Sequence, residues 1–209
     1  MKTMKIKVLT IFLGLYTFAI GQTSDSLNIS SEKQSWKVFS EIDLGLIAFT
    51  GGFANYFGVR NGPHGFELGY QHFPAPSTLF SGVPEGFDLT VEHIYSIHYS
   101  YFWNGKTDKG LYTRFMYHNK MQIVTEQNTN TSKKLYSDCV GAELGYIWYF
   151  SKNFYLTPRV GALYYINSPQ GKENNPVLVG SSYYDNKRHK TWDTYFIPTI
   201  SVGYSIPIK

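Results

Sequence analysis

The ionisable residues of this chain fall mostly on one face of segments in which apolar and polar side chains alternate. In the longest such segment, from Phe87 to Trp103, one set of alternate positions is apolar or aromatic, and the other carries Asp, Glu, Ser and His. Alternation of this length predicts a strand with one apolar and one polar face. Over the whole chain, the charged and imidazole side chains predicted on polar faces are Glu41, Asp43, Glu67, Asp88, Glu92, His98, Arg114, Glu143, Arg159 and Asp193.

Charged side chains gathered on one face of a sheet can have either of two roles. They can line an ion-selective pore, or they can form a packed polar core in which each arginine bridges several carboxylates. The second interpretation is favoured, because a buried charge without a partner is costly and such groups come paired. We therefore predict that Arg114 and Arg159 each serve several acids, and that His98 is a hydrogen-bonded core residue rather than a metal ligand.

Catalysis and metal binding have weaker support. His93 is predicted on the apolar face, where a lipid-modifying enzyme would need a Ser or Asp within hydrogen-bond reach of it. Ser40 is the only serine predicted on an outer mid-strand face, and it belongs to a distant segment. His64, His72 and His189 lie in or beside predicted loops, without metal-ligand spacing. We predict no catalytic residue, no metal site and no cofactor.

Residues 1–21 are typical of a secretory signal peptide. Three lysines within the first seven residues precede an uncharged apolar run over 8–19. Ala19-Ile20-Gly21 then places small residues at the −3 and −1 positions of a cleavage before Gln22. The apolar run is too short for a membrane-spanning helix.

The remaining residues are predicted to form a polar periplasmic lead-in, 22–34, and a single domain, 35–209. The formal net charge is +4, and it falls to about +1 without the signal peptide, so no nucleic-acid partner is predicted. Cys139 is the only cysteine, which excludes an intramolecular disulfide. Aromatic residues make up 18% of the chain and charged residues 16%, and no segment has the sustained 3.6-residue periodicity of amphipathic helices.

Eight alternating segments can be read along the domain. They are 36–49, 53–60, 65–73, 87–103, a segment that begins at Gly110, a segment that ends at Phe150, 154–166 and 192–206. The first is expected to place Leu44, Leu46 and Ala48 on its outer face, and the fourth to place Phe87, Leu89 and Val91 there. Strands with an apolar outer face and a polar inner face predict a closed antiparallel transmembrane β-barrel.

The lengths of the connections predict how this barrel threads the membrane. Short turns are expected at 61–64, 104–109 and 151–153, and long loops at 74–86, 119–133 and 167–190. Outer-membrane barrels have short periplasmic turns and long external loops, and an even number of strands puts both termini in the periplasm.

Aromatic side chains end two of these strands on the same side of the barrel. They are Tyr99, Tyr101, Trp103, Tyr146, Trp148 and Phe150. We expect them to form an aromatic girdle at the periplasmic membrane interface.

Two segments resemble a known family. The hairpin YIWYFSKNFYLTPRVGALYY and the final strand FIPTISVGYSIPIK are similar to the small outer-membrane β-barrel proteins of the Bacteroidota type. The resemblance implies an eight-stranded barrel inserted by the outer-membrane assembly machinery, which reads a C-terminal strand ending in an aromatic residue. Tyr204, Ile206 and Ile208 alternate as required, but the chain ends in Lys209. Asp25-Ser26-Leu27 also resembles the short glycan-acceptor motif of such bacteria.

Three functions remain open from the sequence. The first is a non-enzymatic outer-membrane barrel with a packed polar lumen, which contacts lipid and acts in envelope structure or surface interaction through its outer loops. The second is a narrow porin-like channel for small solutes, and the third is a lipid-modifying enzyme that uses His93 or a loop histidine. Lumen packing separates the first two, and the neighbours of His93 test the third.

Overall fold

The computed structural model of the 209-residue chain describes residues 35–74, 83–105, 108–166, 176–185 and 194–208. The signal peptide, the polar lead-in and the Asp25-Ser26-Leu27 motif lie outside the described residues and stay predictions.

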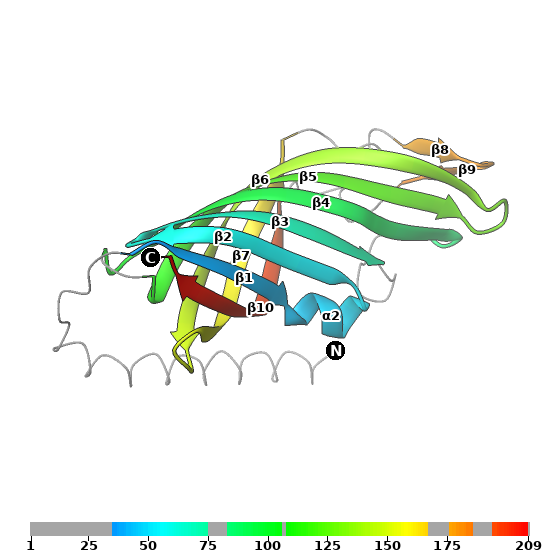
Figure 1. Cartoon of the computed structure of the whole chain (residues 1–209). Helices are drawn as coiled ribbons and strands as arrows, with labels where there is room; N and C mark the ends of the chain where they lie inside the picture. Colours follow the sequence, from blue (N-terminus) through cyan, green and yellow to red (C-terminus); the bar gives the residue numbers. More distant parts are fainter. Residues whose placement is uncertain (1–34, 75–82, 106–107, 167–175, 186–193, 209) are drawn as a thin grey trace, which may run out of the picture. The chain divides into compact units, whose positions relative to one another are not determined.

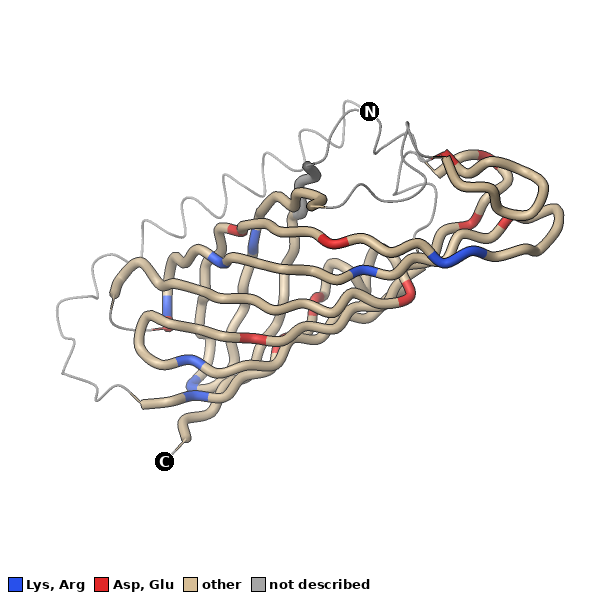
Figure 2. The backbone as a smooth tube through the Cα atoms, turned by 90° about the horizontal axis from the view of Figure 1, so that it is seen from above, with Lys and Arg blue, Asp and Glu red and all other residues tan. Residues whose placement is uncertain are grey.

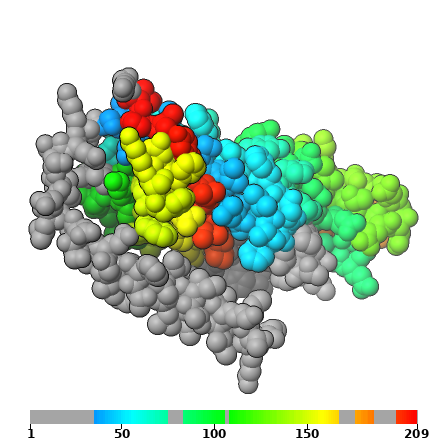
Figure 3. Space-filling view, turned by 60° about the horizontal axis from the view of Figure 1, so that its bottom comes forward, coloured from blue at the N-terminus to red at the C-terminus, as the bar shows by residue number. Residues whose placement is uncertain are grey.

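Eight strands close into an antiparallel barrel in the order β1-β10-β7-β6-β5-β4-β3-β2 (Figure 1), which confirms the predicted architecture. They are β1 (Lys37–Asp43), β2 (Phe53–Asn61), β3 (His64–Pro74), β4 (Phe87–Phe102), β5 (Gly110–Glu126), β6 (Thr131–Tyr149), β7 (Phe154–Tyr165) and β10 (Thr194–Pro207). The barrel closes where β1 pairs with β10, from Lys37↔Pro207 to Asp43↔Ser201. In Figure 3, β10 (red) lies between β7 (yellow) and β1 (blue).

The three predicted short turns lie at the same end of the barrel, which we call the turn end. The turn at 61–64 and the described part of the turn at 104–109 lie close together, because Phe102 N–H donates to Pro63 O at 2.8 Å. The third turn reaches the last strand, since Ser205 N–H donates to Asn153 O at 2.9 Å. Both described ends of the chain lie here as well, because Ile208 N–H donates to Trp36 O at 2.7 Å.

The outer wall is apolar. Its exposed side chains form what we call the apolar band, and they include Ile42, Phe57, Leu68, Ile97, Phe115, Leu144, Val160 and Ile200. The predicted facing of β5, β6 and β7 is confirmed by their alternating burial. Within the described wall, the charged side chains at the centres of the strands are buried on the inner face, whereas Asp138 is half-buried on the outer face of β6 between Tyr136 and Val140. Figure 2 marks the backbone positions of the charged residues.

The strand predicted over 36–49 is wrong beyond Asp43. The chain turns there into a short helix, α2 (Leu44–Thr50). The Asp43 carboxylate caps the helix by accepting from Leu46 N–H at 2.9 Å, and Gly51 ends it in the left-handed conformation at φ 67°. Alternating apolar residues fit a strand or a helix over so short a length, and these end signals decide between them. No helix in the described part of the chain is both long and apolar enough to span a membrane.

The prediction of which β4 side chains face outward is also wrong for the residues that precede Glu92 in the sequence. The pairing of β4 with β5 shifts between Val91 and His93, which marks a β-bulge. One extra residue reverses the phase of the alternation. As a result, Phe87, Leu89 and Val91 are buried inside rather than exposed outside, whereas Tyr95 and the residues after it face as predicted.

The expected loop 119–133 is largely strand. β5 continues to Glu126, β6 starts at Thr131, and a four-residue turn joins them. The hairpin projects past the end of β7 (Figure 1), because β7 pairs with β6 only as far as Tyr165↔Cys139. The loop expected over 167–190 also contains a hairpin, β8 (Val177–Val179) and β9 (Ser182–Tyr184). Residues 75–82, 167–175 and 186–193 lie outside the described part of the chain.

The β8–β9 hairpin packs on the inner face of the projecting sheet. One buried cluster joins the two parts, and its members are Phe87, Leu89, Val124, Leu135, Val177, Val179 and Tyr184. The bulge in β4 makes this cluster possible, because it turns Phe87 and Leu89 inward.

Candidate functional site: a charged network inside the barrel

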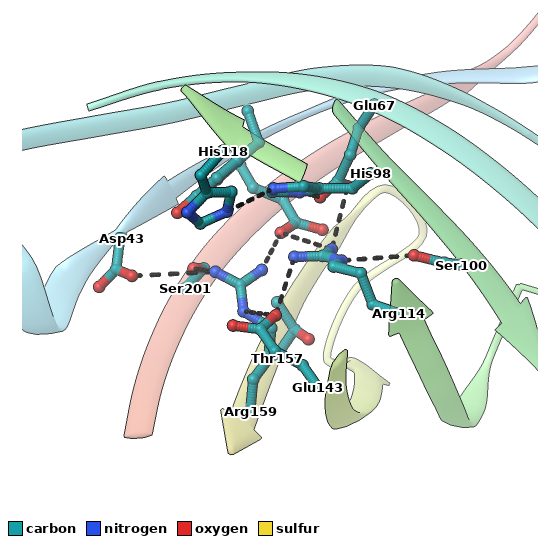
Figure 4. A network of polar contacts seen from close by, with 12 residues as sticks. Asp43, Glu67, His98, Ser100, Arg114, His118, Glu143, Thr157, Arg159 and Ser201 are labelled. Atoms are coloured by element: carbon teal, nitrogen blue, oxygen red, sulfur yellow. Dashed lines mark hydrogen bonds and ion pairs between the residues drawn. The ribbon is translucent and has the colours of Figure 1, made fainter. Parts of the chain in front are cut away.

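Every strand of the barrel sends a polar side chain into one buried network, which we call the interior network (Figure 4). Its members are Glu41 and Asp43 of β1, Arg60 of β2, Glu67 of β3, His98 of β4, Arg114 of β5, Glu143 of β6, Arg159 of β7 and Ser201 of β10. Inward positions on neighbouring strands lie at similar height, so side chains far apart in sequence meet across the barrel.

Glu41 is the centre of the interior network and is fully buried. Its Oε1 accepts from Arg60 Nη2 at 2.6 Å and from the Tyr155 hydroxyl at 3.0 Å. Its Oε2 accepts from Arg159 Nη1 at 2.7 Å and lies 3.6 Å from Arg114 Nη2. One carboxylate therefore links three guanidinium groups from three strands.

Arg114 connects this centre to Glu67. Its Nη2 donates to Glu67 Oε2 at 2.9 Å, and its Nε donates to Ser100 Oγ at 3.3 Å. Arg114 also lies 3.6 Å from Glu143. The structure thus brings together Arg114 and three of the acids that were predicted on inner faces.

Arg159 occupies the other side of Glu41. It donates from Nη2 to Ser201 Oγ at 2.7 Å and from Nε to Thr199 Oγ1 at 3.0 Å. Ion pairs join it to Glu143 at 3.6 Å and to Asp43 at 3.8 Å. Asp43 therefore caps α2 and faces Arg159 with the same carboxylate, which ties the end of β1 to the interior network.

His98 forms the histidine part of the interior network. Its Nδ1 lies 2.5 Å from Glu67 Oε1, and its Nε2 lies 3.2 Å from Nε2 of His118, which comes from β5. Both imidazoles are buried. His118 was not singled out from the sequence, because it lies where β5 was expected to give way to a loop.

Arg60 is a third buried arginine that the sequence reading missed. Its guanidinium lies 3.6 Å from the centroid of the Phe39 ring and 4.9 Å from that of Tyr155, distances typical of cation–π contacts. The signal was present, since Ala54, Tyr56, Gly58 and Arg60 alternate and all are buried. The segment predicted over 53–60 ends at Arg60, whereas β2 continues to Asn61, so the strand positions Arg60 on its inner face.

Two of the predicted inward acids lie elsewhere. Glu92 sits in the bulge of β4, half-buried, and its backbone carbonyl is 2.8 Å from His72 Nδ1. Asp88, in the segment above the bulge, is exposed, and its carboxylate accepts from Gln127 Nε2 at 2.9 Å. Among the ion pairs of the described residues, none involves either acid. Asp193 lies outside the described residues.

Tyrosine rings fill the space around the charges. Tyr155 covers Gly203 and Tyr112 covers Gly145, and a Cβ atom at either glycine would overlap the ring. Tyr112 also shares a hydrogen bond with Thr157 Oγ1 at 3.0 Å. Large side chains therefore pack over inward glycines of β6 and β10.

A second polar group lies at the turn end. Asp108 accepts from Lys37 Nζ at 2.8 Å and from the Tyr149 hydroxyl at 2.8 Å. Burial by itself raises the pKa of the Asp108 carboxyl, but Arg60 and Lys37 outweigh this and hold the pKa below its usual value. Asp108 is therefore a charged partner in this group.

The predicted girdle residues Tyr99, Tyr101, Trp103, Tyr146, Trp148 and Phe150 lie on the outer face near the turn end. The aromatic surface continues beyond them, since Phe150 packs on Phe154 at 6.3 Å between ring centroids and Phe154 on Tyr204 at 4.8 Å. Trp103 Nε1 donates to Thr113 Oγ1 at 2.9 Å.

His93 lies on the outer face, with its ring 4.6 Å from that of Tyr95. Within the described residues, no hydrogen bond joins it to a serine or a carboxylate. The described residues also contain no group of three or more His, Cys, Asp or Glu side chains placed to hold a metal ion.

No protein-family signature matches the chain, and no curated protein sequence is similar to it. Solved structures resemble it, and they include the following two. A major outer membrane protein from Thermus thermophilus superposes with a TM-score of 0.46 at 12% identity, over 83% of this chain and 100% of that one. Neisserial surface protein A gives a TM-score of 0.42 at 12% identity, over 83% and 95% of the two chains. Likeness at this level adds no argument about function.

Proposed function

We propose that this protein is an integral outer-membrane barrel whose interior is closed by the interior network and which acts in the cell envelope through its lipid-facing wall and its projecting hairpins. The observation that carries the proposal is that all eight strands contribute a polar side chain to one buried network, in which the charges of β1, β2, β3, β5, β6 and β7 pair with one another. Such a network fills the lumen instead of lining a path through it.

The wall supports the membrane part of the proposal. The apolar band has members on all eight strands, aromatic side chains gather at the turn end, and the charged side chains at the centres of the strands are buried on the inner face. Lipid offers no hydrogen bonds, so a closed sheet with this distribution suits a bilayer. Lipid is therefore the first partner. The outward alternation of Tyr204, Ile206 and Ile208 on and beside β10 supports insertion by the outer-membrane assembly machinery as the second.

The hairpins support the surface part. The β5–β6 hairpin and the β8–β9 hairpin lie at the end opposite the turns, where external loops are expected. Leu178 and Tyr183 pair across the β8–β9 hairpin and are both exposed. These parts form the surface through which an envelope partner would be contacted.

The test is electrical recording of the refolded protein in planar bilayers at neutral pH. Wild type should pass no steady current, because no charge of the interior network is free to leave its partners. Arg114→Ala should be less stable and should leak, since it removes a group that contacts Glu41, Glu67 and Glu143. Breaking a buried ion pair costs roughly 3–5 kcal/mol, less where water enters.

Leu144→Ala is the matched control, because Leu144 lies on the outer face of β6, next to Glu143, and its loss leaves no unpaired charge. It should stay silent and lose less stability. Steady conductance of the wild type would replace this proposal with the channel.

A further inference from the structure

The contact between His98 and His118 limits how many protons the two side chains can hold. A hydrogen bond between two imidazole nitrogens needs one N–H and one lone pair. The two Nε2 atoms are 3.2 Å apart, so one of them carries hydrogen and the other does not. Nδ1 of His98 also carries hydrogen, because it faces a Glu67 oxygen at 2.5 Å and a carboxylate only accepts.

Uptake of one proton preserves this contact. With either imidazole charged and the other neutral, one Nε2–H still points at a lone pair. Uptake of two protons destroys it, because both Nε2 atoms then carry hydrogen and two cations face each other. The pair therefore has a geometric limit of one extra proton.

The surroundings oppose the doubly charged state. Among the described residues, Glu67 of β3 is the acid that contacts the pair directly, and it is already shared with Arg114 at 2.9 Å. Lys120 lies two positions beyond His118 on β5 and is buried as well. Among the described residues, further ionisable groups near the pair are Arg114 of β5, whose positive charge acts on His118, Tyr56 of β2, whose ring is 5.5 Å from that of His98, and Cys139 of β6, which is opposite His118.

The second nitrogen of His118 makes the first proton costly as well. Its Nδ1 is buried and has no hydrogen-bond partner among the described residues. Whichever imidazole takes up the first proton, His118 Nδ1 then carries hydrogen without an acceptor, which is a costly arrangement in a buried site.

We propose that the His98–His118 pair makes the closure of the barrel acid-sensitive, because uptake of the second proton separates the imidazoles and draws Glu67 out of its contact with Arg114. The proposal rests on the closed interior of the proposed function. The protons come from solvent, and no other reactant is involved.

The experiment records single-channel currents of the full chain in planar bilayers from about pH 7.5 down to about pH 3, because burial and a first proton on the pair lower the pH at which the second proton binds. Wild type should be silent at the upper limit. Its opening events should increase by roughly tenfold or more per pH unit of acidification, the dependence expected for uptake of at least one proton. His118→Gln should stay closed throughout, because its amide donates to His98 Nε2 and does not titrate.

The matched control is His64→Gln. His64 lies on the outer face, 2.8 Å from the Tyr99 hydroxyl, and should leave the acid response of the wild type unchanged. As a second measurement, ¹⁵N NMR of the histidine rings of the wild type should show both His98 and His118 protonated in the pH range of opening.

The outcomes separate the two proposals. Steady current of the wild type at about pH 7.5 contradicts the closed interior itself. Silence at both limits, or a ring of the pair that stays neutral while the barrel opens, contradicts only the acid-sensitive pair. Acid opening of His118→Gln equal to that of wild type assigns the response to the carboxylates and overturns the role of His118.

Discussion

Glu41 contributes more to the interior than any other single residue. It is fully buried and receives hydrogen bonds from Arg60, Tyr155 and Arg159, with Arg114 within ion-pair distance. A carboxylate with this many donors compensates charges that no water can reach. Its removal would leave three guanidinium groups to share the remaining acids, and a buried pair broken on one side is strongly destabilising.

We therefore expect Glu41→Gln to lower the free energy of unfolding by roughly 3–5 kcal/mol, although the side chain keeps its shape. Urea unfolding of the refolded protein, followed by tryptophan fluorescence, measures this. Ile42→Ala is the control at the next position of β1, where the side chain is exposed on the outer face and its loss leaves no cavity or charge. Equal losses for the two variants would mean that the central carboxylate is not needed.

At the scale of elements, the β8–β9 hairpin is attached by one acid as well as by apolar packing. Glu126, at the end of β5, accepts from Ser181 N–H and from Ser181 Oγ, each at 3.0 Å, and from Thr129 Oγ1 at 2.5 Å. Hydrogen bonds from Ser182, Thr129 and Ser181 lower the pKa of Glu126 to about 2. The carboxylate form is thus the form that holds the hairpin.

The sign of the pH dependence follows from this lowered pKa. The stabilisation is fully present above the ordinary value of 4.5 and is lost as the pH falls toward about 2. Amides of Val177–Tyr184 should therefore lose protection from hydrogen exchange over that interval, after correction for intrinsic rates. Glu126→Gln should reduce protection at neutral pH and remove this acid step, whereas Glu85→Gln, in an exposed turn, should change neither. An unchanged acid step in Glu126→Gln would contradict the attachment.

At the scale of the whole molecule, the three short turns and both described ends of the barrel share one end, and the two hairpins lie at the other. This asymmetry is the basis for the proposed orientation, with the turn end in the periplasm. Orientation can be tested by labelling introduced cysteines, because the only native cysteine, Cys139, is buried in the interior.

Asn128→Cys, in the turn between β5 and β6, should react with a membrane-impermeant maleimide on intact cells. Lys152→Cys, in the turn between β6 and β7, should react only after the outer membrane is opened, and wild type should not react in either case. The opposite pattern of labelling would mean that the barrel is inserted the other way round.

The residues that could be placed from sequence are those on strands whose alternation is unbroken. Arg114, Glu143 and Arg159 face inward as predicted because β5, β6 and β7 keep a constant phase through these positions. Glu92 could not be placed, because a bulge adds one residue without any change in composition. Arg60 and His118 could not be placed, because the predicted segments end at these positions whereas β2 and β5 continue beyond them.

The sequence by itself determined a barrel with an apolar outside and a charged inside, because a strand of period two assigns each residue to a face without reference to any partner. Only the tertiary structure decided which charges meet. Glu41 and Arg159 are separated by 118 positions, and they bond because the barrel closes β1 onto β10 and so brings β7 within reach. The pairing of the whole sheet decides which strands close the barrel. It also decides where along a strand a bulge reverses which side chains face inward, and no local pattern of residues indicates either.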